Sequence, residues 1–173
     1  MRGPSVVLSN RRPVGVCILV TDEGRRDMTP SVCVARMTEG DGDAVQSAAH
    51  VFTGHPDLDE SAIQAFLDDS RAYLMLGYVE DDPAGFALAY ALPRIDARGA
   101  MLYLHEVDVL PAFRRMGVAT ALIDALLGIC REAGFSEMFV ISNQSNLAAM
   151  RLYESTGGER PAADDVVFVY ETG

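Results

Sequence analysis

Cysteine is scarce in this chain, and its few positions exclude two classes of small protein. The three cysteines, Cys17, Cys33 and Cys130, are odd in number and widely spaced. They match neither a disulfide framework nor the ligand spacing of a zinc site. We therefore expect buried, reduced thiols and no metal centre.

Long apolar runs are also missing. No stretch approaches the roughly 20 residues that a helix needs to cross a bilayer. Arginines precede the apolar segment 14–20, which faintly resembles a signal peptide, but the segment is short and no small-residue cleavage site follows it. The sequence therefore predicts a cytoplasmic protein without a membrane partner.

Positive charge is the third shortage. Lys and Arg together number 14 against 25 Asp and Glu, which gives a formal net charge of −11. Such a surface repels nucleic acid and anionic membranes, so no nucleic-acid partner is expected. It attracts cations, which favours a polycationic small-molecule amine as substrate, although the same charge also serves solubility alone.

Hydrophobic residues, in contrast, are plentiful. They make up 49% of the 173 residues, enough to form the core of one globular domain. We expect this domain at 31–173, after an N-terminal extension at 1–30. Within the extension, segment 14–20 is either an extra edge strand, which would suit a homodimer, or is not essential, with Met28 as the true start.

Periodicity and turn residues predict a regular order of elements from residue 31 onward. Strands are expected at 32–37, 72–79, 86–92, 101–109, 137–142 and 166–170, and helices at 41–52, 62–69, 119–133 and 146–155. Ser61 is the expected cap of the second helix. A strand–helix–strand crossover in the second half predicts a parallel pair in a mixed sheet, and hence an α/β protein.

The segment Arg114-Arg115-Met116-Gly117-Val118-Ala119 lies between an expected strand and an expected helix. Free backbone N–H groups at a helix start point outward, and the helix dipole favours an anion there. Gly117 lets the backbone approach a ligand closely, and the two arginines add charge. This pattern predicts a phosphate-binding loop.

Two carboxylates interrupt the apolar strand that precedes this loop. Alternation places Leu102, Leu104, Glu106 and Asp108 on one face and Tyr103, His105 and Val107 on the other, unless a bulge alters the phase. A buried carboxylate is costly unless it faces a cleft or is paired. We expect Glu106 to be a general base and Asp108 to bind substrate or act as a second base. The alternative is a salt bridge to Arg114 or Arg115, and His105 is a rival base that its face disfavours.

At family spacing the loop is followed by Asn146-x-x-Ala149-x-x-x-Tyr153-x-x-x-Gly157. Together the two motifs resemble those of the GNAT superfamily of N-acetyltransferases, over about residues 31–171. The resemblance implies the GNAT fold, a central mixed, mostly antiparallel sheet with a splayed parallel strand pair and helices on both faces. It implies acetyl-CoA as acetyl donor. The contacts implied for acetyl-CoA are Val107, Val109, Arg114, Arg115, Met116, Gly117, Val118, Ala119, Thr120 and Asn146.

Tyr153 is the second catalytic residue that the resemblance implies. Its hydroxyl would protonate the departing thiolate of the acyl donor. The alternative is a tyrosine that packs its helix on the sheet. For Asn146, the alternative to contact with acetyl-CoA is to cap its own helix.

The stretch 72–153 resembles the aminoglycoside 3-N-acetyltransferases of the GNAT type, in segments 85–93, 102–107, 114–123 and 148–157. Two departures are Glu106, where those enzymes carry aspartate, and the loop 143–147, which lacks paired aspartates. The resemblance implies direct acetyl transfer to an aminoglycoside amine, with antibiotic resistance as the result. The acidic residues expected to border the acceptor are Asp57, Asp59, Glu60, Asp164 and Asp165. A polyamine or protein-amine acetyltransferase, or a non-catalytic acyl-CoA-binding module, is the alternative.

Overall fold

A computed structural model describes residues 31–54, 58–96, 98–160, 162 and 170. The chain divides into two compact units, Met1–Ile141 and Ser142–Gly173, and each is described by itself. The segment 14–20 and residues 166–169 of the strand expected at 166–170 lie outside the described residues, and Tyr170 is exposed. Among the residues described, no helix is long and apolar enough to cross a membrane.

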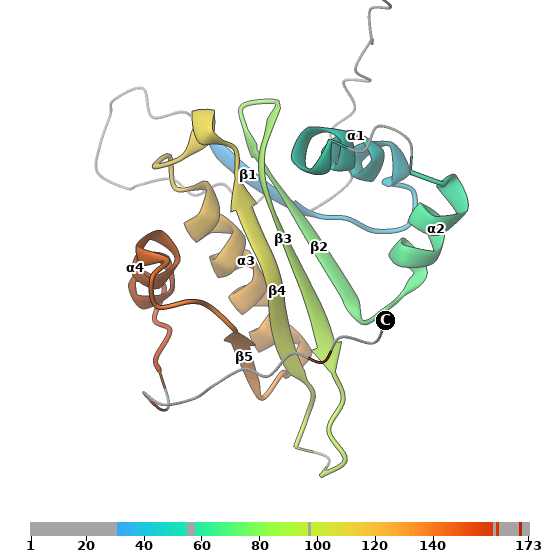
Figure 1. Ribbon diagram of the computed structural model, residues 1–173. Coiled ribbons are helices and arrows are strands. Elements are labelled where there is room, and N and C mark those ends of the chain that lie inside the picture. The colour runs from blue at the N-terminus through green and yellow to red at the C-terminus, as the bar shows by residue number, and fades with distance from the viewer. Residues whose placement is uncertain (1–30, 55–57, 97, 161, 163–169, 171–173) are drawn as a thin grey trace, which may run out of the picture. The chain divides into compact units, whose positions relative to one another are not determined.

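The first unit is built on a five-stranded sheet with the order β1-β2-β3-β4-β5 (Figure 1). Its strands are β1 (Val32–Arg36), β2 (Ala72–Val79), β3 (Asp82–Leu92), β4 (Met101–Val109) and β5 (Glu137–Val140). Neighbouring strands are antiparallel from β1 to β4, and β5 pairs with β4 in parallel. This confirms the mixed, mostly antiparallel sheet with one parallel pair.

Helix α3 (Val118–Ala133) covers one face of this sheet (Figure 1). Its Leu122 and Leu126 are fully buried, and small residues of β3, Ala87 and Ala89, are fully buried as well. At Gly85 of β3 even a methyl group would lie 3.0 Å from the Val118 side chain. Small side chains on β3 therefore allow α3 to pack closely on the sheet.

Helices α1 (Gly42–Thr53) and α2 (Glu60–Asp68) pack on the opposite face, toward β1 and β2 (Figure 1). Their buried side chains form one cluster with strand residues: Ala35, Met37, Val45, Ala48, Ile63 and Leu76. Phe52 of α1 contacts Phe86 of β3 edge-to-face, with ring centroids 5.0 Å apart. The expectation of helices on both faces is confirmed.

Several element boundaries differ from the sequence-based expectation, most of them by one or two residues. Helix α2 is capped by Asp59 rather than Ser61, since the Asp59 carboxylate accepts hydrogen bonds from the backbone N–H groups of Ser61 and Ala62. Strand β3 begins at Asp82 rather than 86, and its first residues pair with β2 across a register shift that leaves Ala84 as the extra residue. Strand β5 ends at Val140 rather than 142.

The expectation of three reduced cysteines was wrong for Cys33. This residue of β1 is half-buried and disulfide-bonded, whereas Cys17 lies outside the described residues. Cys130 of α3 is free and buried, as expected, and burial raises the pKa of its thiol. Spacing along the chain does not reveal which cysteines come within bonding distance.

The second unit contains α4 (Leu147–Ser155). The side chain of Asn146 caps this helix, because its Oδ1 accepts a hydrogen bond from the Ala149 N–H at 3.1 Å. The helix ends at Thr156, and Gly157 follows with a φ of 87°. The capping alternative for Asn146 is therefore realised, while its contact with acetyl-CoA stays a prediction.

Candidate functional site

The parallel strands β4 and β5 pair along only part of their length. Their register begins at Met101 opposite Glu137 and ends at Leu104 opposite Val140, whereas β4 continues to Val109. Within the described residues, the outer edge of β4 beyond Leu104 has no strand partner. An unpaired strand edge offers backbone hydrogen-bonding groups to an extended ligand.

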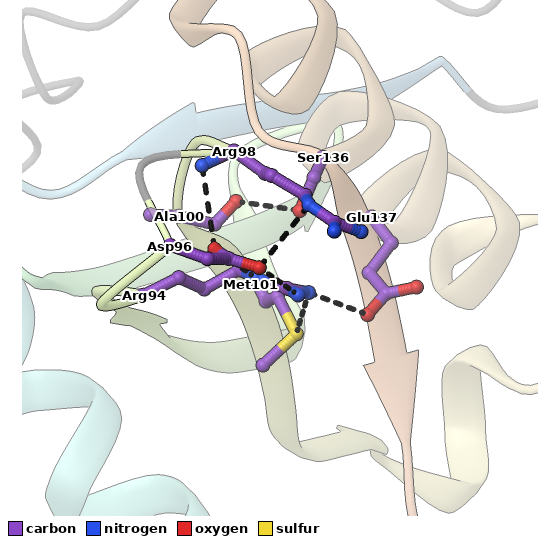
Figure 2. A network of polar contacts seen from close by, with 7 residues as sticks. All are labelled: Arg94, Asp96, Arg98, Ala100, Met101, Ser136 and Glu137. Carbon is purple, nitrogen blue, oxygen red and sulfur yellow. Dashed lines mark hydrogen bonds and ion pairs between the residues drawn. The ribbon is translucent and has the colours of Figure 1, made fainter.

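The opposite end of this strand pair is held by a polar network (Figure 2). Arg94, in the loop between β3 and β4, forms a two-point ion pair with Asp96, at 3.0 and 2.7 Å, and lies 3.9 Å from Glu137 of β5. Ser136 donates backbone and hydroxyl hydrogen bonds to the Ala100 carbonyl, at 2.9 and 3.2 Å. The strands are thus tied together where they start, and β4 leaves β5 toward its carboxyl end.

The chain that follows β4 forms a loop suited to an anion. After the 3-10 turn Pro111–Phe113, Arg115 and Gly117 have φ values of 68° and 85°. No side chain caps the start of α3, and its first turn contains no acidic residue. A Cβ on Gly117 would meet nothing within 4 Å, so the backbone here is open to a ligand. Free N–H groups at an uncapped helix start bind phosphate, which fits the pyrophosphate of acetyl-CoA.

Arg114 contacts the end of β4, and its contact with acetyl-CoA stays a prediction. Its Nε donates to the Val109 carbonyl at 3.0 Å, and its Nη2 lies 3.9 Å from Asp108 Oδ1. The same Asp108 oxygen accepts from the Val109 N–H at 2.8 Å. Both backbone groups of Val109 are thus engaged by neighbouring side chains, and the salt-bridge alternative for Asp108 is realised. Arg115, which is exposed, remains as the cation beside the loop.

The expected alternation along β4 was wrong beyond Leu104. Leu88 of β3 pairs with Glu106 and Ala89 pairs with Leu104, so His105 is the extra residue of a β-bulge. The bulge shifts the phase by one residue, as bulges do. Glu106 and Asp108 still share a face, but it is the face opposite Leu102 and Leu104.

The face of Glu106 follows from its cross-strand neighbours. Glu106 and Asp108 lie opposite Leu88 and Phe86, and Phe86 contacts α1. Both carboxylates therefore lie on the side of the sheet away from α3. Glu106 is exposed, and no hydrogen bond or ion pair joins it to another described residue. Its carboxylate is free to bind an ammonium group and accept a proton.

Tyr153 lies on α4 in the second unit, half-buried, and burial raises the pKa of its hydroxyl. A raised pKa keeps the phenol protonated, which suits a proton donor. Its position beside the acetyl donor stays a prediction.

The acidic residues expected around the acceptor lie at different positions in the chain, and only two of them are among the described residues. Asp59 caps α2, and hydrogen bonds from the Ser61 hydroxyl and backbone hold its pKa below the usual value. Glu60 is the exposed first residue of α2. Asp57, Asp164 and Asp165 lie outside the described residues, so their proposed role stays a prediction.

A five-stranded mixed sheet with one parallel pair has the arrangement of the GNAT fold, and the open loop at the start of α3 suits an anionic ligand. Residues 43–157 match the model of the acetyltransferase (GNAT) family, and the chain belongs to this family. Acetyl-CoA is the acetyl donor of GNAT acetyltransferases.

Two curated relatives and one solved structure are similar to this chain. The chain is 35% identical over 85 residues to the ribosomal protein bS18-alanine N-acetyltransferase of Haemophilus ducreyi, with 49% of the chain and 55% of that protein covered. It is 30% identical over 157 residues to the mycothiol acetyltransferase of Clavibacter sepedonicus, with 86% and 49% covered. The chain thus spans about half the length of these curated relatives.

The solved structure is an aminoglycoside acetyltransferase from an uncultured soil metagenomic sample, in complex with sisomicin. The TM-score is 0.69 at 23% identity, with 82% of this chain and 95% of the other covered. At this identity the likeness concerns the fold alone.

Proposed function

We propose that this chain is an acetyl-CoA-dependent N-acetyltransferase that acts on an amine of an aminoglycoside antibiotic, at the 3-amino group. The observation that carries the proposal is Glu106, an exposed carboxylate without a described partner beside the unpaired edge of β4. The net charge of −11 favours a polycationic acceptor. Acetylation removes one positive charge from such an antibiotic, which weakens its binding to anionic RNA and would confer resistance.

In the proposed mechanism the backbone N–H groups of residues 115–120 bind the pyrophosphate, and Val107 offers its backbone to the extended arm of the donor. Acetyl-CoA, when bound, supplies the thioester whose acetyl group is transferred. Glu106 holds the ammonium of the acceptor and takes its proton, which leaves a neutral amine able to attack the thioester carbon. As the carbon–nitrogen bond forms and the carbon–sulfur bond breaks, the Tyr153 hydroxyl would give its proton to the departing sulfur and would regain one from the acetylated nitrogen, which carries one proton too many after the attack.

A second candidate is acetylation of a protein amine. This candidate is favoured by the relative from Haemophilus ducreyi, which is named as an acetyltransferase of a ribosomal-protein alanine. The two candidates share the donor site and the role of Glu106, so only the acceptor separates them.

The test is thiol release from acetyl-CoA with gentamicin, spermidine and an alanine-initiated peptide as acceptors. Glu106→Gln is compared with the wild type and with Asp124→Asn, a matched change on the exposed side of α3. Loss of a general base is expected to lower kcat about 10²- to 10⁴-fold. The chain contains no lysine, so acetylation of its own lysine side chains adds no background.

Fast turnover with gentamicin that collapses in Glu106→Gln, but not in Asp124→Asn, would support the proposal. Mass spectrometry and NMR of the product then identify the acetylated ring position. Turnover with the peptide alone would show that the acceptor is a protein amine and not an aminoglycoside. Acetyl-CoA binding without thiol release from any acceptor would point instead to a non-catalytic acyl-CoA-binding module.

A further inference from the structure

Four ring-bearing side chains form a continuous row across β3, β4 and β5, here called the aromatic strip: Tyr90, Tyr103, His105 and Phe139. The His105 ring contacts Tyr90 and Tyr103 edge-to-face, with centroids 5.9 and 5.7 Å apart. Tyr103 stacks on Phe139 with a centroid distance of 5.2 Å and an interplanar angle of 24°. Each ring thus contacts at least one other ring of the row.

The aromatic strip lies on the same face of the sheet as Glu106. Tyr90 pairs with Tyr103, and Tyr90 is two residues from Leu88, the cross-strand partner of Glu106. Directly paired residues, and residues two apart on a strand, project from the same face. The bulge at His105 brings its ring to this face too, since it contacts both tyrosines. The strip therefore begins next to the proposed base.

The aromatic strip is accessible, in contrast to the part of this face under α1 and α2. Tyr90, Tyr103 and Phe139 are half-buried and His105 is exposed. The cluster under α1 and α2 involves β1, β2 and Phe86, and it includes no residue of the strip. In the part of the chain that the structure describes, the rings thus form an open surface on three neighbouring strands.

We propose that the aromatic strip is the acceptor subsite that selects a polycationic amine, by binding a second ammonium group of the acceptor while Glu106 holds the reacting one. This inference rests on the proposed function. Ring faces attract cations through their quadrupole, and a carboxylate beside them adds charge of the complementary sign. Three strands about 4.8 Å apart give the strip a width of roughly 10 Å. The subsite therefore distinguishes an acceptor with two separated cations from a simple monoamine.

The test compares two acceptors in Tyr103→Leu, which keeps apolar volume but removes the central ring. Phe135→Leu is the matched control, since Phe135 is also half-buried but contacts Tyr73, which is buried on the α3 side of the sheet. The acceptors are gentamicin, with several ammonium groups, and cyclohexylamine, with one. We expect the KM for gentamicin to rise about twofold to thirtyfold in Tyr103→Leu, the range of a cation–π contact. The KM values for cyclohexylamine and acetyl-CoA stay unchanged.

An equal change in KM for both acceptors, or no change, would overturn the subsite and leave acetyl transfer intact. A lower melting temperature of Tyr103→Leu with an unchanged KM for gentamicin would show that the rings serve only in packing. Without thiol release from any acceptor, the proposed function fails. Calorimetric titration of gentamicin in the presence of CoA then still decides the subsite, since equal affinity in wild type and Tyr103→Leu contradicts it.

Discussion

Replacing Gly85 by alanine tests how β3, β4 and α3 are held together at the donor site. A Cβ at this position would lie 2.8 Å from the Asp108 carbonyl oxygen, 3.0 Å from Val109 Cγ2 and 3.0 Å from Val118 Cγ1. The carbonyl belongs to the backbone of β4 and is not able to swing aside as a flexible side chain would. The substitution therefore requires β4 or the start of α3 to move away from β3.

Overpacking of this kind costs about 1–3 kcal/mol of unfolding free energy. For a chain of this size the melting temperature falls by about 2–4 °C per kcal/mol, so we expect a decrease of about 2–12 °C in Gly85→Ala. Val118 opens the helix whose N-terminus forms the anion loop. Because its displacement would disturb the free N–H groups, the KM for acetyl-CoA should rise as well.

Gly128→Ala supplies the matched control. Gly128 lies within α3, where an added Cβ would meet only Arg131 Nη2, at 3.9 Å. Alanine in a helix interior is favoured over glycine, so this variant should gain about 0.5–1 kcal/mol. Urea unfolding followed by circular dichroism measures both variants. If Gly85→Ala is as stable as the wild type, the close approach of β4 and α3 to Gly85 is incorrect.

Three further predictions concern single residues. Gly117→Ala should lose about 1–2 kcal/mol of unfolding free energy, measured by thermal unfolding, because the φ of 85° disfavours a side chain. The same substitution should raise the KM for acetyl-CoA. An unchanged KM would argue against the loop as the donor site. Burial, with the nearby Asp41 carboxylate, raises the pKa of Tyr78 to about 12. The free energy of unfolding should therefore fall as the pH rises from about 10 to about 12, and it should fall less in Tyr78→Phe. Unfolding measured over this range of pH tests the expectation. The lowered pKa of Asp59 contributes stability that is present above its ordinary value of 3.8 and lost as pH falls through the lowered value. Asp59→Ala lacks this contribution, so the difference in unfolding free energy between the wild type and Asp59→Ala should shrink as pH falls below 3.8 in acid unfolding, and a difference that does not change with pH would contradict the cap.

Several features follow from the sequence because local patterns determine them. The helical stripe of α3 and the preceding Gly117 predicted the helix start within one residue, since glycine tolerates the left-handed backbone that the turn requires. The bounds of β2 and β4 were also predicted correctly, because each is a long apolar run between turn residues. The parallel pairing of β5 with β4 followed from the connecting helix.

Other features depend on contacts between segments, and the sequence offered them only as alternatives. The bulge at His105 exists because β3 pairs with both sides of it, and no residue within β4 marks the position. The ion pair of Asp108 with Arg114 requires the chain to turn back on itself after Val109. The sequence offered binding roles for both residues and a salt bridge as the alternative; the structure contains the salt bridge, and the binding roles stay predictions.

The two carboxylates of β4 differ in what surrounds them, and this difference supports separate roles. Asp108 accepts a hydrogen bond from the Val109 N–H and lies beside Arg114, so its charge is partly compensated within the protein. Glu106 has no such partner among the described residues, and a bound ammonium group would be its counter-ion. An unpaired carboxylate gains more from an incoming cation than a paired one, because it loses no existing contact. Because of the bulge, the Glu106 carboxylate lies on the same face of the sheet as the rings of Tyr103 and His105, rather than on the opposite face. One extra residue in β4 thus brings the proposed base and an aromatic surface to the same face of the sheet.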